Sequence, residues 1–186
     1  MFAGTAIQVI SLDEAGIIGS GIEDGATLEE NSYKKAQFAW HQKPNELWTM
    51  AEDTGLFIDA LDGEPGLITA HWAGEEVKGA ALTQYAIKRI KELPEAHRSA
   101  YWKTVATVIA PSGTVKTFTG IARGTLLAEP RGEMQPDLPY SAIFVPDEGN
   151  GKTWSEIAAV SIDDENAISH RDQAFRQVRE YLLNQL

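Results

Sequence analysis

The chain has 186 residues, 43% of them hydrophobic and 23% charged, which is enough for one core and short for two domains. We therefore expect a single domain over residues 1–186. Its 27 acidic and 16 basic side chains give a net charge of −11, which argues against a surface for nucleic acid or an anionic membrane. A nucleotide is not excluded, because a divalent metal can screen its phosphates.

Three further features bound the location of the protein. No apolar run approaches the ~20 residues that span a bilayer, and the opening residues MFAGTAIQVI lack the basic stretch of a signal peptide. The absence of cysteine excludes disulfides, thiolate metal sites and cysteine nucleophiles together. A reducing compartment fits this composition, so we expect a cytoplasmic protein.

The first half of the chain is predicted to contain three strands and two helices. In chain order these are a strand over 6–12, a helix over 27–43, strands over 47–53 and 55–61, and a helix over 75–93. Thr27 and Glu30 form the signature of a capping box at the start of the first helix. A sharp turn is expected at Thr54–Gly55, which leaves Glu52 and Asp53 at a strand end.

The second half is predicted to begin with a hairpin and to end with a helix. Strands over 101–110 and 114–127 flank Pro111-Ser112-Gly113, a strong hairpin signal. A strand over 141–146, a short helix over 153–160 and a helix over 169–186 with Ser169 as its N-cap complete the chain. Because strands and helices intermix, we expect an α/β fold with a mixed sheet.

Three polar clusters are candidates for chemistry. Glu52 and Asp53 present the hard oxygen ligands that Mg²⁺ takes, although acidic strand ends are also commonly just solvated. Glu29, Glu30 and Asn31 form a second cluster on the first turn of the helix over 27–43, where Glu30 also stands at the position of a capping-box carboxylate. His170 and Arg171 begin the last helix, where free N–H groups favour an anion, but two exposed polar side chains are an equally good reading.

Taken together, five stretches resemble a known family. SLDEAGI, EDGATLEENSYKKA, AEDTGLFIDALDGEPG, GIARGTLLAEPRGE and AISHRDQAF occur in the order and near the spacing of the non-canonical purine nucleoside triphosphate pyrophosphatases, also called inosine triphosphate pyrophosphatases. The resemblance implies a long twisted mixed sheet flanked by helices, two lobes around a cleft and a homodimer. It also implies Mg²⁺-dependent hydrolysis of ITP, XTP or dITP to the monophosphate and pyrophosphate.

The resemblance also assigns roles to residues of the candidate clusters. Glu30 and Asp53 would hold the metal, Asp53 would orient the attacking water, and Glu52 would support it. The remaining positions would bind substrate: His170 and Arg171 would contact the 6-oxo side of the purine, Ser169 would help to place them, and Tyr140 would lie against the base. A 6-oxo group accepts a hydrogen bond where adenine donates, so such contacts discriminate between purines.

The sequence departs from the family pattern at positions that bind substrate. Its first residues resemble the family's second strand, so the preceding phosphate-binding strand and loop are expected to be absent. Ser141 stands where an aspartate contacts the base, Glu165 where a lysine contacts phosphate, and His71 where arginine is common. We therefore expect weakened or altered hydrolysis; the alternative is a catalytically inactive homologue that binds a nucleotide or another small molecule.

A missing first strand would also expose a sheet edge. An unpaired edge invites pairing with another chain, so a homodimer or a swapped assembly is expected.

Overall fold

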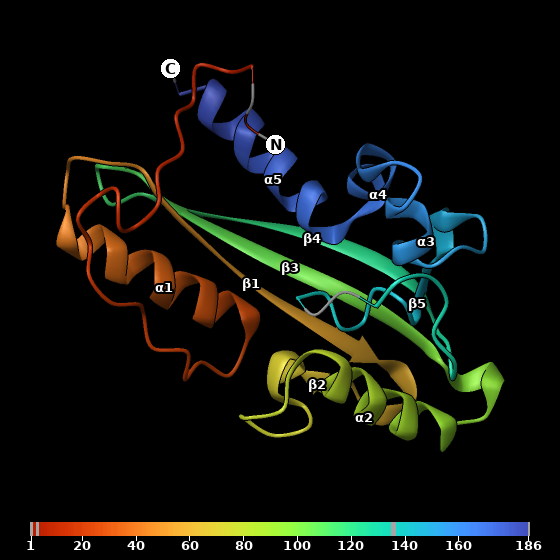
Figure 1. Cartoon of the computed structure of the whole chain (residues 1–186). Helices are drawn as coiled ribbons and strands as arrows, with labels where there is room; N and C mark the ends of the chain where they lie inside the picture. Colours follow the sequence, from red (N-terminus) through yellow and green to blue (C-terminus); the bar gives the residue numbers. More distant parts are fainter. Residues whose placement is uncertain (1, 3, 135–136, 186) are drawn as a thin grey trace. The chain divides into compact units, whose positions relative to one another are not determined.

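The protein has an α/β fold in which helices flank a five-stranded antiparallel sheet of order β2-β1-β3-β4-β5 (Figure 1). The structure is a computed structural model and describes residues 2, 4–134 and 137–185. The strands are β1 (Thr49–Ile58), β2 (Pro65–Gly66), β3 (Ser99–Ile109), β4 (Val115–Leu126) and β5 (Phe144–Pro146). The helices are α1 (Leu28–Gln42), α2 (Gly79–Lys91), α3 (Trp154–Ala158), α4 (Ile162–Ile168) and α5 (His170–Leu183).

The sheet is antiparallel, whereas the sequence predicts a mixed one. β1 pairs with β2 at Leu56↔Gly66, and β4 pairs with β5 at Leu126↔Phe144, both antiparallel. The predicted hairpin is confirmed: β3 and β4 meet at a tight turn closed by the Gly113 N–H, which donates to the Ala110 carbonyl at 2.8 Å. A tight turn of this kind reverses the chain and therefore makes its two strands antiparallel.

The turn predicted at Thr54–Gly55 is wrong, because β1 runs through both residues as one strand. The glycine serves a close approach of two backbones instead of a reversal. A Cβ atom on Gly55 would lie 2.6 Å from the carbonyl oxygen of Gly66 on β2, which is far inside contact distance. Glu52 and Asp53 therefore lie in the middle of a strand and not at its end.

The strand predicted over 6–12 does not form. No described strand pairs with this segment, and a strand without a partner leaves its backbone hydrogen bonds unmade. The side chains of Val9, Ile10 and Leu12, which produce the strand-like pattern, are exposed by 58%, 40% and 40%. Hydrophobic alternation alone was thus insufficient evidence for a strand.

One predicted helix begins at another residue, and one helix was not predicted. α2 begins at Gly79, four residues after the predicted start at 75, and α4 is a helix that the sequence pattern did not predict. α4 has no buried side chain among its seven residues, so it carries no hydrophobic periodicity to detect. Its N-cap is Ser161, whose hydroxyl accepts a hydrogen bond from the Asp164 N–H at 3.1 Å.

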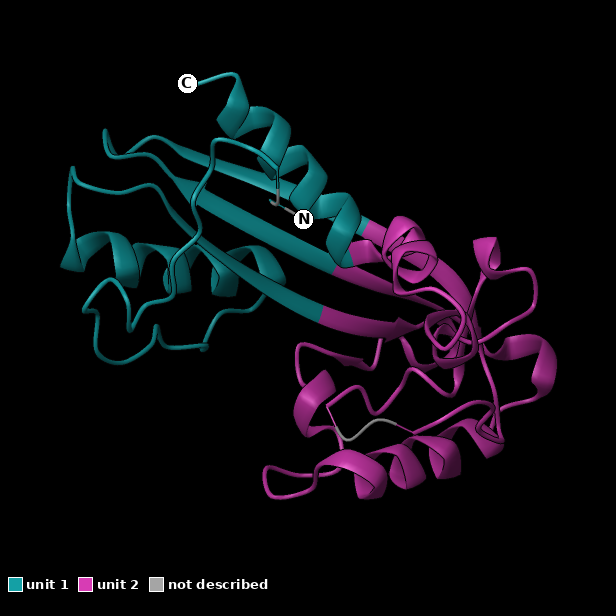
Figure 2. Ribbon diagram, turned by 45° about the horizontal axis from the view of Figure 1, so that its top comes forward, with its two compact units in different colours: residues 1–54, 104–120, 171–186 teal, residues 55–103, 121–170 magenta. Residues whose placement is uncertain are grey.

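The chain divides into two compact units (Figure 2). Unit 1 contains Met1–Thr54, Thr104–Gly120 and Arg171–Leu186, and unit 2 contains Gly55–Lys103 and Ile121–His170. The strands β1, β3 and β4 contribute residues to both units. A single domain over 1–186 remains a prediction.

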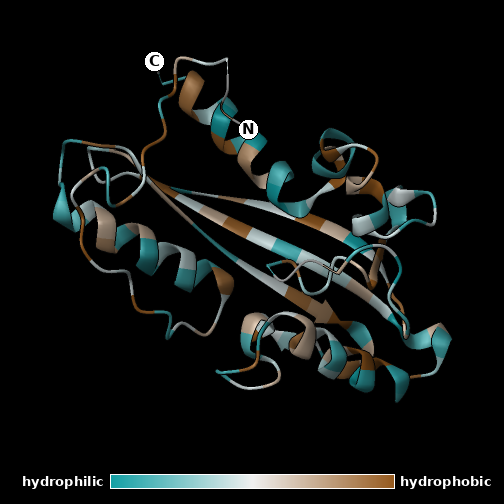
Figure 3. Ribbon diagram, viewed as in Figure 1, coloured by the Kyte–Doolittle hydropathy of each residue, from teal (hydrophilic) through white to brown (hydrophobic). Residues whose placement is uncertain are grey.

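In unit 1 the two faces of β3 are covered by different helices. Ala106 and Val108 pack in one apolar cluster with Ala174 and Val178 of α5. Thr107, between them, points the other way, and its hydroxyl lies 2.7 Å from that of Ser32 on α1. Figure 3 shows hydrophobic and hydrophilic bands succeeding one another along α5, as expected of a helix with one buried side.

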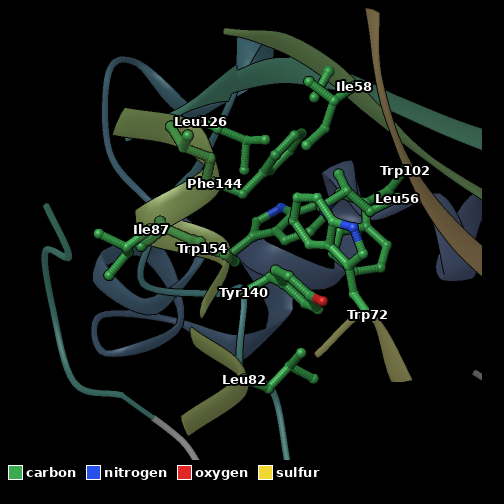
Figure 4. Close-up of a cluster of buried hydrophobic side chains, with 14 of the residues drawn as sticks. Leu56, Ile58, Trp72, Leu82, Ile87, Trp102, Leu126, Tyr140, Phe144 and Trp154 are labelled. Carbon is green, nitrogen blue, oxygen red and sulfur yellow. The ribbon is translucent and has the colours of Figure 1, made fainter. Parts of the chain in front are cut away.

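Unit 2 contains the larger core, which is rich in aromatic side chains (Figure 4). Trp72, Trp102, Tyr140, Phe144 and Trp154 gather there with aliphatic residues of β1, β4 and α2. These rings come from segments far apart in the sequence, so their contacts hold the unit together. Within the described residues no helix has the length and apolar character needed to cross a bilayer.

Candidate functional site

Several of the residues singled out from the sequence lie in two clusters of side chains, one in each unit. The acidic cluster belongs to unit 1 and is formed by Asn31, Lys35, Glu52, Asp53 and Arg171. The aromatic cluster belongs to unit 2 and is formed by Trp102, Tyr140, Trp154 and His170.

Asp53 is the best-held carboxylate of the acidic cluster. It is only 8% exposed, Oδ1 accepts a hydrogen bond from Lys35 Nζ at 2.8 Å, and Oδ2 accepts one from Asn31 Nδ2 at 3.2 Å. Burial raises the pKa of Asp53 above its ordinary value, and the hydrogen bond and positive charge of Lys35, with the hydrogen bond from Asn31, oppose that rise. The reading of Asp53 as a solvated strand-end carboxylate is therefore wrong.

Asn31 belongs to the predicted cluster on the first turn of α1, whereas Lys35 had no predicted role, and both donate hydrogen bonds to Asp53. They lie four residues apart on α1 and so share one helix face, a spacing that the sequence displays. Asn31 also accepts a hydrogen bond from the Gly25 N–H at its Oδ1, 2.8 Å away, which orients its amide group toward Asp53. What the sequence could not show is that this face lies against β1.

Glu52, the neighbour of Asp53, forms an ion pair with Arg171 and does not share the partners of Asp53. Its Oε1 lies 3.0 Å from Arg171 Nη2, and its Oε2 accepts a hydrogen bond from the Thr54 hydroxyl at 2.7 Å. Successive side chains of a strand point to opposite faces, which explains why Glu52 and Asp53 have different partners. Arg171 Nε is buried and has no hydrogen-bond partner in the structure. Arg171 is thus anchored at one edge of its guanidinium group.

Glu30 is exposed on the first turn of α1 and acts as a cap. The Thr27 hydroxyl accepts a hydrogen bond from the Glu30 N–H at 3.1 Å, as the capping box predicts. The Glu30 carboxylate reaches one residue further back than in that motif, to the Ala26 N–H at 2.7 Å. The structure therefore supports the capping reading of Glu30.

In unit 2, His170 is buried against the aromatic cluster and is not an exposed polar residue at a helix start. It is 8% exposed, and its ring lies flat on Trp102 with centroids 5.4 Å apart and planes 11° apart. It also contacts Trp154 at 5.4 Å with a tilt of 46°. The preceding Ser169 is buried in the link between α4 and α5.

Tyr140 and Ser141 are tied into the interior of unit 2. The Tyr140 hydroxyl donates to the Thr69 carbonyl at 2.7 Å, and burial raises the pKa of this phenol above its ordinary value. The Ser141 hydroxyl donates to the Leu138 carbonyl at 2.8 Å and lies 2.9 Å from the hydroxyl of Ser155. Ser141 therefore links a loop to α3 in this structure.

His71 is the last residue of a short 3-10 helix, Thr69–His71. Its Nδ1 is 3.2 Å from Glu75 Oε2, without the geometry of a hydrogen bond, and its side chain is 38% exposed. Among the residues that the structure describes, no group of three or more histidine, aspartate and glutamate side chains is placed to hold a metal ion. Asp53 and Glu30 do offer the hard carboxylate oxygens that Mg²⁺ prefers, so the donor chemistry fits that ion.

The protein is thus an α/β protein with a buried, hydrogen-bonded carboxylate in unit 1 and a cluster of buried aromatic side chains in unit 2. The Ham1 family model matches residues 1–181, and the chain belongs to that family. The resemblance inferred from the sequence motifs is thereby confirmed.

Relatives with curated names agree with the family match. The chain is 35% identical over 185 residues to the dITP/XTP pyrophosphatase of Caldanaerobacter subterraneus subsp. tengcongensis, covering 100% of this chain and 88% of the relative. It is 34% identical over 176 residues to the dITP/XTP pyrophosphatase of Opitutus terrae, covering 95% and 84%. These relatives are hydrolases that act on nucleoside triphosphates.

Solved structures confirm the fold. A HAM1 protein from Coxiella burnetii aligns with a TM-score of 0.84 and 28% identity, covering 97% of this chain and 88% of that one. The Ham1 protein of Staphylococcus aureus aligns with a TM-score of 0.83 and 27% identity, covering 96% and 88%.

Proposed function

We propose that this chain hydrolyses oxopurine nucleoside triphosphates of the dITP, ITP and XTP kind to the monophosphate and pyrophosphate. The names of its curated relatives support this substrate class. The observation that carries the proposal is the buried carboxylate of Asp53, held at both oxygens by Lys35 and Asn31. A partly desolvated carboxylate with a perturbed pKa and a fixed orientation is the kind of group that active sites use as a base.

Asp53 acts as the group that orients the attacking water and accepts its proton. Its raised pKa moves it toward the range in which a general base is effective at neutral pH. As the water oxygen bonds to phosphorus, the bond between the α- and β-phosphates breaks and pyrophosphate leaves. Lys35 keeps the Asp53 carboxylate in one orientation throughout.

Mg²⁺ is the proposed cofactor, with Glu30 and Asp53 as its protein ligands. There it would neutralise phosphate charge and favour deprotonation of the attacking water. Two carboxylates suffice for such an ion, because water and substrate phosphates complete its coordination.

Base selection is assigned to His170, Arg171 and Tyr140. The 6-oxo group of the purine accepts hydrogen bonds from His170 and Arg171, whereas the 6-amino group of adenine leaves those donors unpaired. Glu52 orients Arg171 by accepting a hydrogen bond from one end of its guanidinium group. Ser169 and His71 complete the set inferred from the resemblance, with Ser169 placing the first turn of α5.

We further propose that the activity is weakened or altered in substrate range. The Ser141 hydroxyl is hydrogen-bonded to groups in the interior of unit 2, so it does not take the place of an aspartate that contacts the purine base. Glu165 adds negative charge where a lysine would meet phosphate, and like charges repel. A homodimer and a cytoplasmic location belong to the same proposal, the latter supported by the absence of cysteine.

An inactive nucleotide-binding homologue is the alternative function. One observation favours it: both oxygens of Asp53 and the carboxylate of Glu30 are already engaged by protein donors. A binder of this kind takes its ligand without requiring a metal.

The test is pyrophosphate release from ITP, XTP, dITP and the standard triphosphates, with and without Mg²⁺. We expect metal-dependent release from the oxopurine substrates, and Asp53→Asn should lower the rate roughly a thousandfold, or about 4 kcal/mol of barrier. Asp62→Asn is the matched control, because Asp62 is exposed and has a left-handed backbone that asparagine also tolerates. No release from any substrate by folded wild-type protein favours the binding homologue, whereas full activity in Asp53→Asn shows that hydrolysis does not depend on Asp53.

A further inference from the structure

Trp102, on β3 within unit 2, contacts both aromatic-cluster residues that were assigned to the base. Its indole lies flat on the His170 ring, with centroids 5.4 Å apart and an interplanar angle of 11°. The same indole meets Tyr140 nearly edge-on, at 5.5 Å and 67°. Figure 4 shows Trp102, Tyr140 and Trp154 gathered in the core of the unit. One side chain thus contacts two candidate base-binding rings.

The contact is held by packing and not by a hydrogen bond. Trp102 is 8% exposed, and its Nε1 is buried without a hydrogen-bond partner in the structure. Trp154 Nε1 is likewise buried without a hydrogen-bond partner in the structure, and the Trp154 ring contacts both Trp102 and His170 in a tilted arrangement. A buried indole N–H usually finds a partner, and leaving it unpaired costs stability. The broad flat ring of Trp102, and not its polar group, therefore explains its place beside His170.

Flat stacking fixes the plane of an imidazole ring. The second torsion of a histidine side chain is intrinsically broad, so the ring plane is set by what lies against it. Hydrogen bonds from imidazole nitrogens run close to the ring plane and weaken steeply as the angle departs from linear. The orientation of the His170 ring consequently decides whether its N–H points at a particular acceptor on a bound base.

We propose that Trp102 is a positioning residue that sets the ring plane of His170 and, through it, the preference for 6-oxo over 6-amino purines. The inference rests on the proposed function and extends it to a residue that no sequence motif identified. It predicts that selectivity, rather than folding alone, depends on the Trp102 ring.

The test compares the ratio of kcat/KM for ITP over ATP among variants. Trp102→Leu removes the flat ring and should lower the ratio at least about tenfold, the value of one well-placed hydrogen bond. Trp102→Phe keeps an aromatic face and removes only the unpaired N–H, so the ratio should stay within about threefold of wild type. Trp102→Met provides a second ring-free variant if the leucine variant does not fold.

The matched control is Trp72→Leu. Trp72 is 6% exposed in the same core, but its aromatic and cation–π partners are Tyr85 and Arg89. This variant should lose stability as Trp102→Leu does while retaining the selectivity ratio. An unchanged ratio in both folded ring-free Trp102 variants, or an equal loss in Trp72→Leu, overturns the inference.

A second measurement does not depend on activity. The imidazole proton resonances of His170, assigned with His170→Gln, should be displaced upfield by the Trp102 ring and should return downfield in Trp102→Leu but not in Trp72→Leu. Resonances that do not move with Trp102→Leu contradict the stacking itself. Wild-type protein that shows the displaced resonances but hydrolyses no oxopurine substrate would instead count against the proposed function, and the selectivity role would fall with it.

Discussion

At the scale of single residues, the pairing of Lys35 with Asp53 makes a prediction about pH. Lys35 opposes the rise in the pKa of Asp53 that burial causes, so removing its charge should raise that pKa further. In Lys35→Met the acidic limb of the kcat/KM profile should therefore move to higher pH, with a loss of about 10- to 100-fold at neutral pH. Pyrophosphate release measured between pH 5 and 9 checks both effects. Lys34→Met, at the more exposed neighbouring residue, is the control. Coincident pH profiles for wild type and Lys35→Met contradict the proposed effect of Lys35 on Asp53.

Asp53 also links stability to pH. Because its pKa in the folded state is raised, its contribution to stability is fully present below the pKa of aspartate in the unfolded chain and is lost as pH rises through the folded value. Asp53→Asn does not titrate, so its stability relative to metal-free wild type should increase from pH 3 to pH 7. Urea unfolding of both proteins across that range measures the difference, and a difference that falls as pH rises contradicts the raised pKa.

At the scale of elements, β5 is held against β4 through a glycine. Gly124 lies opposite Pro146, and a Cβ atom there would come within 2.2 Å of the Val145 carbonyl oxygen on the β5 backbone. Gly124→Ala should therefore push β5 away and destabilise the protein by about 3 kcal/mol. Thr125→Ala, on the exposed neighbouring position, should change stability by well under 1 kcal/mol. Thermal or urea unfolding compares them, and similar stabilities for the two variants would show that β5 adjusts freely.

At the scale of the whole molecule, charge should govern how substrate arrives. The net charge of −11 repels a nucleoside triphosphate, even one whose charge is partly neutralised by Mg²⁺. Raising the ionic strength from about 0.01 M to 0.15 M shortens the screening length from about 30 Å to 8 Å. We expect kcat/KM to rise roughly twofold to fivefold over that range at saturating Mg²⁺. A steady fall in kcat/KM with added NaCl indicates that local cations, and not the overall charge, steer the nucleotide.

The sequence by itself determined the family, the α/β class, the hairpin between β3 and β4 and the start of α1. These features depend on local signals: turn residues at Pro111–Gly113, the cap at Thr27, and motifs whose residue order is visible without a structure. The same local reasoning failed for residues 6–12 and for the turn at Gly55. A strand forms only where another strand pairs with it, and the neighbouring residues do not show whether such a partner exists. A glycine can serve a close approach of two backbones as well as a turn, and the local sequence does not distinguish the two.

Tertiary structure alone decided which polar groups meet. Asp53 obtains Lys35 and Asn31 because α1 lies against β1, whereas Glu52, one residue away, obtains Arg171 from α5. His170 is stacked on Trp102 because β3 and the start of α5 converge within unit 2, although 68 positions separate the two residues in the sequence numbering. Local propensity and motif spacing act over a few residues, while burial, pKa and ring stacking depend on neighbours that the chain brings together only when it folds.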